Sequence, residues 1–313
     1  MVNMKLILSD KELCGIDFPE DVIIEKVNIK KLDDYSCNSS VVAIVGSRAM
    51  AIKCADMEFT SLRFFQLTSA GFDGVPCEEY RQKGVVVANA GSVYSIPIAE
   101  TVVFGMLLMA KKLHKNANNR HVKLQRHYNT ITELAGKNVL IMGAGNIGTS
   151  IAERLQGFGM VIEGYDPFCV DKPQYRHIIR NRKELLDNIN RYDYVISTLP
   201  DNEQTKGFIN AEIFEKTKKN SVVVNVGRKA VFNEKDFLFA LKKKKIGGAV
   251  LDMFEKLPNP ITNPYRRLSN VVVLPGVAAI SREVNERLTA HITNNLNAML
   301  NGEKINCVIN GVK

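Results

Sequence analysis

Three glycines stand in the motif GAGNIG at residues 143–148, directly after the apolar run NVLIM at 138–142. A glycine-rich turn between a strand and a helix is the arrangement that binds the phosphates of a dinucleotide. Gly143 permits a tight turn, Gly145 lets a pyrophosphate approach the backbone, and Gly148 allows the helix to pack closely on the strand. The start of that helix offers its unpaired N–H groups to the phosphates. The motif therefore predicts a dinucleotide site.

An acidic residue follows at the spacing at which such sites bind ribose. Asp166 directly follows the run VIEGY at 161–165 and lies 18 residues after Gly148. Its carboxylate would accept hydrogen bonds from both hydroxyls of the adenosine ribose and would repel a 2′-phosphate. We therefore expect NAD as the cofactor, with NADP disfavoured. The alternative, an incidental glycine-rich turn beside an unrelated aspartate, is less favoured because context and spacing agree.

The elements that must position these residues follow from short apolar runs that alternate with helix-length segments. Near-continuous apolar strands separated by helices are typical of parallel sheets covered on both faces, so an α/β fold is predicted. Four strands are expected in a first lobe, at 4–8, 41–46, 64–68 and 85–89, and six in a second, at 138–142, 161–165, 193–198, 221–226, 248–252 and 271–274.

Two long helices are predicted, at 97–113 and 282–300. The first has Ser95 as a possible cap, and Pro97 is tolerated in its first turn. It is apolar on nearly every face, so we expect it to lie between lobes or between subunits. Its most apolar window, 101–110, has ten residues, which is too short for a membrane span of about twenty residues.

Length and composition exclude several classes of protein. A chain of 313 residues favours two domains, and 45% apolar with 24% charged residues is ordinary for a globular protein. The net charge of +9 is concentrated at 111–127 and 242–245, but no stacking aromatics are interleaved, so nucleic acid is not expected as a partner. Six scattered cysteines favour a reducing, cytoplasmic setting over a zinc site or disulfides, and no export signal is read at the N-terminus.

Several ordered motifs resemble one enzyme family. TSAGFDGVP and GVVVANAGSVYSIPIAETV, the stretch from STLPDNEQ to FEKLP, and LSNVVVLPGVAAIS are similar to the D-isomer-specific 2-hydroxyacid dehydrogenases, in particular to the glyoxylate and hydroxypyruvate reductase branch. The resemblance runs from about Leu67 to about Ser281. It implies a doubly wound Rossmann domain, residues 97–283, inserted into a smaller flavodoxin-like substrate domain, residues 1–96 and 284–313. It also implies a homodimer and a small anionic substrate.

The resemblance assigns roles to particular residues. The implied substrate contacts are backbone N–H groups at Ala70, Gly71, Gly91 and Ser92, together with the side chain of Arg228. The implied NAD contacts are Gly143, Gly145, Asn146, Ile147 and Gly148 at the pyrophosphate, Asp166 at the ribose, Thr198, Leu199, Pro200 and Thr205 toward the adenosine, Val226, Gly227, Arg228 and Asp252 beside the nicotinamide, and Gly276 and Ala278.

Arg228 is the first residue with a catalytic expectation. It stands in NVGRKA, which resembles the family's NxxRG motif, with Lys229 in place of the glycine. The resemblance implies that Arg228 holds the carboxylate and carbonyl of the substrate, and the planar fork of guanidinium donors suits a carboxylate. A solvated charge at the end of a strand is the alternative.

The family's proton donor is missing from this chain. Relatives carry a histidine in TPHxA and a glutamate in DVFExEP, whereas this chain reads LPGVA and DMFEKLP, so that Gly276 and Leu257 stand at those positions. A buried glutamate without its histidine would be an uncompensated charge, which explains the loss of both. Lys229 and Tyr265 are speculative replacement donors. The histidines at 114, 121, 127, 177 and 291 have no local motif, and ordinary structural roles are expected for them.

Three functions remain open from the sequence. The first is an NAD-dependent oxidoreductase acting on a small 2-keto or 2-hydroxy acid, with weakened or altered chemistry because general acid catalysis contributes about 10²- to 10⁴-fold. The second is an inactive NAD(H)-binding regulatory or scaffold protein of the same fold. The third is an enzyme of this fold with a shifted substrate. Retention of Arg228 favours a carboxylate ligand.

Overall fold

The computed structural model describes residues 4–11, 18–116, 130–252 and 262–312. The chain divides into two compact units, Met1–Tyr94 with Ser281–Lys313, and Ser95–Ile280. The boundaries expected from the sequence are 96/97 and 283/284.

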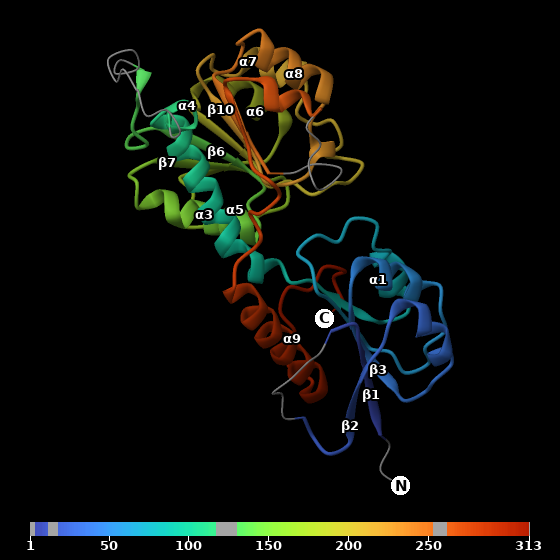
Figure 1. The fold of residues 1–313 in the computed structure, drawn as a ribbon. Helices are drawn as coiled ribbons and strands as arrows, with labels where there is room; N and C mark the ends of the chain where they lie inside the picture. Colours follow the sequence, from blue (N-terminus) through green and yellow to red (C-terminus); the bar gives the residue numbers. More distant parts are fainter. Residues whose placement is uncertain (1–3, 12–17, 117–129, 253–261, 313) are drawn as a thin grey trace. The chain divides into compact units, whose positions relative to one another are not determined.

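The smaller unit holds a parallel sheet of five strands among the described residues (Figure 1). Its strand order is β2-β1-β3-β4-β5, the order of flavodoxin-like sheets, and each neighbouring pair runs parallel. The strands are β1 Lys5–Ser9, β2 Val22–Lys26, β3 Val41–Gly46, β4 Phe64–Leu67 and β5 Val86–Ala88; the helices are α1 Arg48–Ala55, α2 Cys77–Gln82 and α9 Glu283–Asn301.

Successive residues of the strands in this sheet enter different cores, because side chains alternate across a strand. Ile7 packs in a cluster with Val284, Leu288 and Ile292 of α9, whereas Leu8 packs in a cluster with Met50 of α1. Helix α9 thus covers one face of this sheet, and α1 covers the other.

The last helix, predicted at 282–300, spans Glu283–Asn301.

The larger unit holds a parallel sheet of seven strands in the part of the chain that is described (Figure 1). Its order, β12-β11-β10-β9-β6-β7-β8, contains the 3-2-1-4-5-6 arrangement of doubly wound dinucleotide folds when read from β8. The strands are β6 Asn138–Met142, β7 Val161–Tyr165, β8 His177–Ile179, β9 Tyr194–Ser197, β10 Val222–Asn225, β11 Gly248–Leu251 and β12 Val271–Val273. The predicted doubly wound α/β fold is confirmed.

Helices cover both faces of this sheet. On one face a core joins strand residues to α6 Arg182–Asn188, α7 Ala211–Lys216 and α8 Glu234–Lys242, and stacked rings of Phe214 and Phe237 lie within it. On the other face lie α3 Gly91–Ala110 and α5 Asn146–Gln156 (Figure 1). A Cβ atom on Gly105 would lie 2.6 Å from Cγ1 of Val250, so α3 approaches β11 closely at this glycine. The short helix α4 spans Leu113–Asn116.

Two strands were not predicted, and each lies at the edge of its sheet. β2 has only half-buried and exposed residues, and β8 has three residues, of which His177 is exposed. An edge strand is covered on fewer sides, so its sequence does not need the continuous apolar run that identifies a central strand.

Helix α3 begins at Gly91, six residues before the predicted start, so Pro97 lies inside it and Ser95 does not cap it. Asn89 caps it instead, since Asn89 Oδ1 accepts a hydrogen bond from the N–H of Gly91 at 3.1 Å. A proline within a helix leaves the carbonyl four residues earlier without its donor. Here that carbonyl, on Val93, accepts a hydrogen bond from Nε of Arg287 at 3.4 Å, which compensates the loss.

Helix α3 is therefore longer than the ten-residue apolar window that was expected to be too short for a membrane span. Among the described residues, the 20-residue α3 is long and apolar enough to cross a bilayer, and 56% of its most apolar window is buried inside the protein. The core helix of a globular protein passes the same test, so length and composition alone assign α3 to neither environment.

Candidate functional site

The glycine turn after β6 has the geometry that the motif predicts. Gly143 has φ of +99°, a conformation that side chains other than glycine rarely adopt. A Cβ atom there would also lie 2.6 Å from Oγ1 of Thr198, whose hydroxyl donates a hydrogen bond to the Gly143 carbonyl at 2.9 Å. Glycine is thus required at this position by backbone conformation and by space.

The other two glycines of the motif have opposite surroundings. A Cβ atom on Gly148 would lie 2.0 Å from the Gly143 carbonyl oxygen, so the first turn of α5 touches the preceding loop. On Gly145 a Cβ atom would meet nothing within 4 Å, and this residue is exposed. Gly145 is the N-cap of α5 and provides no side-chain cap. An uncapped helix start beside open space fits the phosphates of a dinucleotide.

The carboxylate of Asp166 is held by three backbone N–H groups. Oδ2 accepts a hydrogen bond from Ala144 at 3.0 Å, and Oδ1 accepts from Phe168 at 3.0 Å and from Cys169 at 3.2 Å. A carboxylate has about four acceptor positions, so these bonds leave Oδ2 with a further one. Asp166 therefore ties the loop after β7 to the glycine turn, in addition to the ribose contact predicted for it.

Lys172, which was not among the predicted site residues, also reaches the glycine turn. Its Nζ donates to the carbonyl of Ala144 at 2.6 Å and to Oγ1 of Thr149 at 3.1 Å. No local pattern marks it, because both contacts join residues more than twenty positions apart in the chain.

The loop after β9 lies against the same turn, and the loop after β10 lies against the β9 loop. A Cβ atom on Gly227 would lie 2.9 Å from the carbonyl oxygen of Leu199, so these two loops are in contact. Thr205 closes the β9 loop, because its hydroxyl donates to the Pro200 carbonyl at 2.6 Å. Leu199 and Val226 are buried, while Pro200 is exposed.

Arg228 and Lys229 follow at the end of the β10 loop. Arg228 is half-buried, and its Nη1 donates to the Gly227 carbonyl at 3.1 Å, next to the loop contact just described. Lys229 Nζ lies 3.1 Å from a carboxylate oxygen of Glu234. That ion pair stabilises the charged ammonium and therefore does not favour Lys229 as a proton donor.

Asp252 is 4% exposed and binds three consecutive N–H groups of the loop after β12. Oδ1 accepts from Gly276 and Val277, both at 3.0 Å, and Oδ2 accepts from Ala278 at 2.9 Å. Gly276 has φ of +77°. Residue 276, at which the sequence predicts the absence of the family's histidine, thus has a backbone conformation that favours glycine.

The second speculative donor, Tyr265, lies in the hydrophobic core of the larger unit. It is 6% exposed, its ring centroid lies 5.7 Å from that of Phe237, and burial raises the pKa of its hydroxyl well above the ordinary value. This placement speaks against a donor role. Leu257 falls outside the described residues, as do His121 and His127.

In the smaller unit, the predicted substrate loop follows β4. Within the described residues the N–H groups of Ala70 and Gly71 meet no acceptor, whereas the Ala70 carbonyl accepts from Nδ2 of Asn89 at 2.7 Å. The N–H of Gly91 is already bonded to Asn89, and Ser92 Oγ lies 3.6 Å from Sγ of Cys307. Ala70 and Gly71 are thus better donors to an anion than Gly91 is.

His291 is half-buried, although the sequence suggested an ordinary surface residue. Its Nε2 lies 2.9 Å from the Asn89 carbonyl oxygen, and Asn295 Nδ2 lies 3.3 Å from the same nitrogen. Asn295 is fully buried and also donates to Oε1 of Gln66 at 2.7 Å. A polar network therefore joins α9 to Asn89 and, through it, to the loop at Ala70. A sequence pattern does not reveal such contacts between distant residues.

Comparison with known proteins places this geometry in a family. Residues 103–278, more than half of the chain, match the family described as D-isomer specific 2-hydroxyacid dehydrogenase, NAD binding domain. The chain belongs to the D-isomer-specific 2-hydroxyacid dehydrogenase family. The glycine turn, Asp166 and the loops after β9 and β10 all lie within the matched range.

Individual relatives in the D-isomer-specific 2-hydroxyacid dehydrogenase family differ in length. The chain is 31% identical over 254 residues to D-3-phosphoglycerate dehydrogenase of Methanocaldococcus jannaschii, covering 80% of this chain and 48% of that protein. It is 29% identical over 283 residues to glyoxylate/hydroxypyruvate reductase B of Pectobacterium carotovorum, covering 88% of each. The chain thus spans about half the length of the phosphoglycerate dehydrogenases that it matches.

A solved structure with the same fold is an NADPH-dependent glyoxylate/hydroxypyruvate reductase from Sinorhizobium meliloti in complex with NADP and malonate. It has a TM-score of 0.72 at 22% identity and covers 97% of this chain and 96% of that one. At this identity the likeness shows the fold.

Alanine at two glycines of the turn separates folding from cofactor binding. Gly145→Ala enters open space, so its free energy of unfolding should stay within about 0.5 kcal/mol of the native value while NAD affinity falls about tenfold or more. Gly148→Ala meets a carbonyl oxygen and should lose about 1–3 kcal/mol of stability. Urea unfolding and calorimetric NAD titration measure both, and native NAD affinity in Gly145→Ala would contradict this account of the turn.

Proposed function

We propose that the protein is an NAD-dependent oxidoreductase that acts on the carbon bearing the hydroxyl or keto group of a small 2-hydroxy or 2-keto acid. The observation that carries the proposal is the glycine turn with its open helix start at Gly145, adjoined by the loop that ends at Arg228. Membership of the family supports the same reaction class.

The chain's own residues would bind and orient both reactants. The nicotinamide cofactor, when bound, supplies or accepts a hydride, and the start of α5 and Oδ2 of Asp166 would hold its pyrophosphate and ribose. Arg228 would bind the substrate carboxylate through its planar fork. In the smaller unit, the N–H groups of Ala70 and Gly71 are donors suited to the same class of anion.

We further propose that proton transfer is weakened or altered in this chain. Gly276 and Leu257 stand where relatives carry the histidine and the glutamate. Neither speculative replacement is favoured by its surroundings, since Lys229 is paired with Glu234 and Tyr265 is in the core. Removing a general acid lowers a rate by about 10²- to 10⁴-fold, so turnover slows while binding persists.

A second candidate is a protein that binds NAD(H) and a small acid for regulation or as a scaffold, without turnover. The observation that favours it is the loop after β12, where a buried Asp252 binds three N–H groups around a glycine with positive φ. That loop is ordered by its own hydrogen bonds and does not depend on a catalytic side chain.

Cofactor preference is tested by titrating the protein with NAD and with NADP in a calorimeter. Because the Asp166 carboxylate repels a 2′-phosphate, NAD should bind about tenfold or more tightly than NADP. Asp166→Asn should narrow that ratio. Asp171→Asn is the matched control, since Asp171 is an exposed acid in the same loop and should keep the ratio unchanged. Tighter binding of NADP by the native protein would contradict the proposal; solved structures of this fold include a glyoxylate/hydroxypyruvate reductase and a probable 2-hydroxyacid dehydrogenase, each in complex with NADP.

Restoring the missing pair tests the weakened chemistry. NADH oxidation with glyoxylate and hydroxypyruvate should be slow in the native protein and should rise about 10²-fold or more in Gly276→His with Leu257→Glu. Gly276→Ala is the control, because it adds the strain of a side chain at positive φ, about 1–2 kcal/mol, without an imidazole. Fast native turnover that titrates with pH would refute the missing acid, and binding of NADH and acid without turnover in either form would favour the second candidate.

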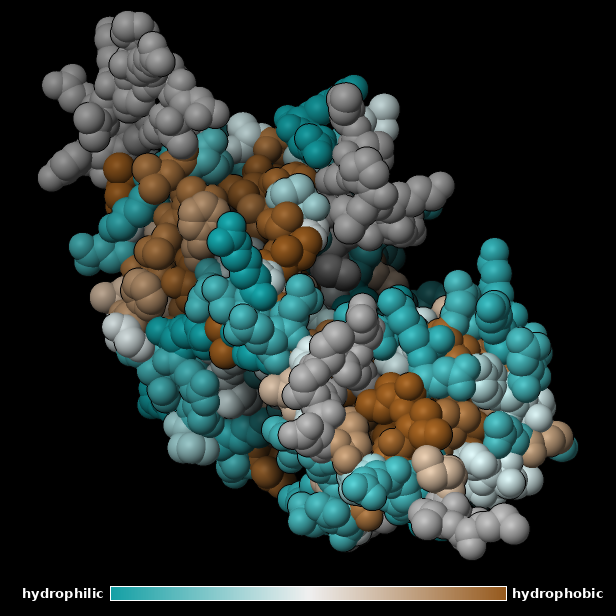
Figure 2. All heavy atoms as spheres, turned by 60° about the horizontal axis from the view of Figure 1, so that its bottom comes forward, coloured by the Kyte–Doolittle hydropathy of each residue, from teal (hydrophilic) through white to brown (hydrophobic). Residues whose placement is uncertain are grey.

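We propose that the protein is a homodimer that associates through α3. Phe104 of α3 is 54% exposed, and Figure 2 shows hydrophobic side chains gathered on the larger unit in the region where Figure 1 draws α3. Phe104→Lys should therefore give a monomer by light scattering after gel filtration. Phe239→Lys is the control, since Phe239 is 52% exposed on α8 and should leave a dimer intact. A native monomer, or two variants that behave alike, would count against an α3 interface.

A further inference from the structure

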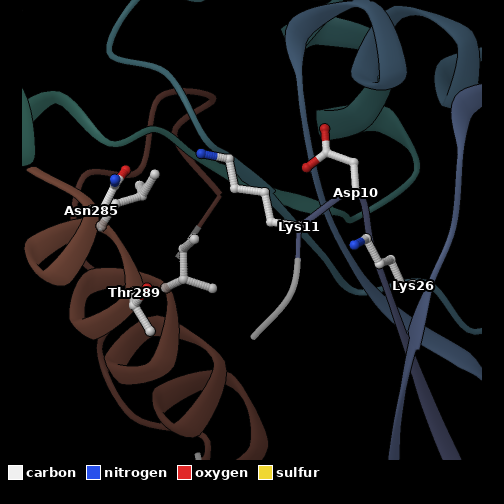
Figure 3. A pocket seen from close by; sticks show the side chains of 7 residues that line it. Asp10, Lys11, Lys26, Asn285 and Thr289 are labelled. Atoms are coloured by element: carbon white, nitrogen blue, oxygen red, sulfur yellow. The ribbon is translucent and has the colours of Figure 1, made fainter. Parts of the chain in front are cut away.

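A cavity of about 300 Å³ lies within the smaller unit, and none of the described residues that line it is among those assigned to substrate or cofactor. One wall of the cavity comes from the ends of two strands and the other from α9 (Figure 3). Asp10 and Lys11 directly follow β1 and Lys26 is the last residue of β2, while Asn285, Leu288, Thr289 and Ile292 come from α9.

The position in the sheet is one at which open parallel sheets bind ligands. Ligands of such sheets lie beyond the carboxyl ends of the strands. The cavity begins at the carboxyl ends of the neighbouring strands β1 and β2, and the point at which this strand order reverses lies on the other side of β1, between β1 and β3. A volume of about 300 Å³ is at the lower end of the range for small-molecule sites.

The polar wall is fixed by hydrogen bonds to the sheet. The buried Ser9 hydroxyl donates to the carbonyl of Lys11 at 2.8 Å and accepts from its N–H at 3.2 Å. Asp10 donates through its N–H to the Val45 carbonyl at 3.0 Å, and its Oδ2 accepts from the N–H of Ser47 at 2.8 Å. The backbone that carries the charged side chains is therefore preorganised.

Of the described residues that line the cavity, Lys11 and Lys26 are basic and Asp10 is acidic, and this balance suits an anion. Figure 3 shows Lys11 extending from the strand side toward α9, while the Lys26 side chain lies on the strand side. Burial raises the pKa of the Asp10 carboxyl, while the Ser47 N–H and Lys11 lower it. Its Oδ1 is buried without a hydrogen-bond partner among the described residues, so a ligand that brings a donor to this wall, after a small rotation of the carboxyl, would satisfy an unpaired acceptor.

We infer that this cavity is a binding site for a small organic acid that carries a carboxylate or phosphate and a hydroxyl group. The two ammonium groups would bind the anionic group, Asp10 and the Thr289 hydroxyl would bind the hydroxyl group, and Leu288 and Ile292 provide an apolar floor. The helix that forms this floor also carries His291 and Asn295, which contact Asn89 and Asn306. Helix α9 and Asn89 therefore connect the cavity to the loop at Ala70, because Asn89 Nδ2 donates to the Ala70 carbonyl.

The test follows the methyl resonance of Ile292, which lines the cavity, during titration with inorganic phosphate, with malonate and with glycerol. Assignment uses Ile292→Val, and the Arg228→Gln background removes the proposed carboxylate site of the larger unit. Phosphate, malonate or both should shift the resonance saturably, with half-saturation on the order of 1 mM, and glycerol should not. Which of the two anions binds identifies the anionic group.

Two double variants make the outcome specific. Lys11→Gln with Lys26→Gln should raise the half-saturating anion concentration about tenfold or more, because two charged donors are lost. Lys30→Gln with Lys31→Gln, a pair of exposed lysines in the same unit, should leave it unchanged. An Ile292 shift that never saturates, or a half-saturating concentration that is equal in both double variants, would overturn the proposal of an anion site. Since no step of this test depends on turnover or on NAD, its failure is distinguishable from failure of the proposed oxidoreductase activity.

Discussion

The approach of α5 to the turn after β6 is possible because Gly148 has no side chain. That contact, in which a Cβ atom would lie 2.0 Å from the Gly143 carbonyl oxygen, fixes where the helix starts. Two further strand ends then join the turn, through Thr198 Oγ1 on the Gly143 carbonyl and Asp166 Oδ2 on the Ala144 N–H. A single close packing contact therefore orders the open helix start and the acid beside it.

The smaller unit uses the same physical rule with different chemistry. Its strands are parallel, so the loops that leave their carboxyl ends meet on one edge of the sheet. Two of these ends carry Asp10, Lys11 and Lys26, and the loop after β4 carries the N–H groups of Ala70 and Gly71. Helix α9 contacts both regions, since Thr289 faces the cavity and His291 bonds to Asn89, whose amide holds the Ala70 carbonyl.

The sequence predicts those parts of the molecule whose signal is local. The glycine spacing predicts the turn after β6, and apolar runs predict each central strand, because such strands must be apolar on both faces. The edge strands β2 and β8 lack that run. The predicted start of helix α3 was too late because proline is usually a first-turn residue of a helix. Pro97 is tolerated inside α3 because Arg287, nearly two hundred residues away in the chain, donates to the carbonyl that the proline leaves without a donor. Lys172 and His291 likewise act through contacts that no local pattern encodes.

The loop after β12 contains Gly276, the residue proposed to stand where relatives carry a histidine, and its backbone is held by hydrogen bonds to Asp252. Asp252 is a buried carboxylate, and an unpaired charge in that environment is costly, so the three N–H groups of residues 276–278 compensate it. Residue 276 in this loop has φ of +77°, which glycine adopts freely and a residue with a Cβ adopts at a cost of about 1–2 kcal/mol. The absence of a side chain at this position is therefore consistent with the hydrogen bonds around it. An imidazole introduced at residue 276 must either accept that strain or shift the backbone and disturb the bonds to Asp252, so recovery of a proton donor depends on the loop as well as on the side chain.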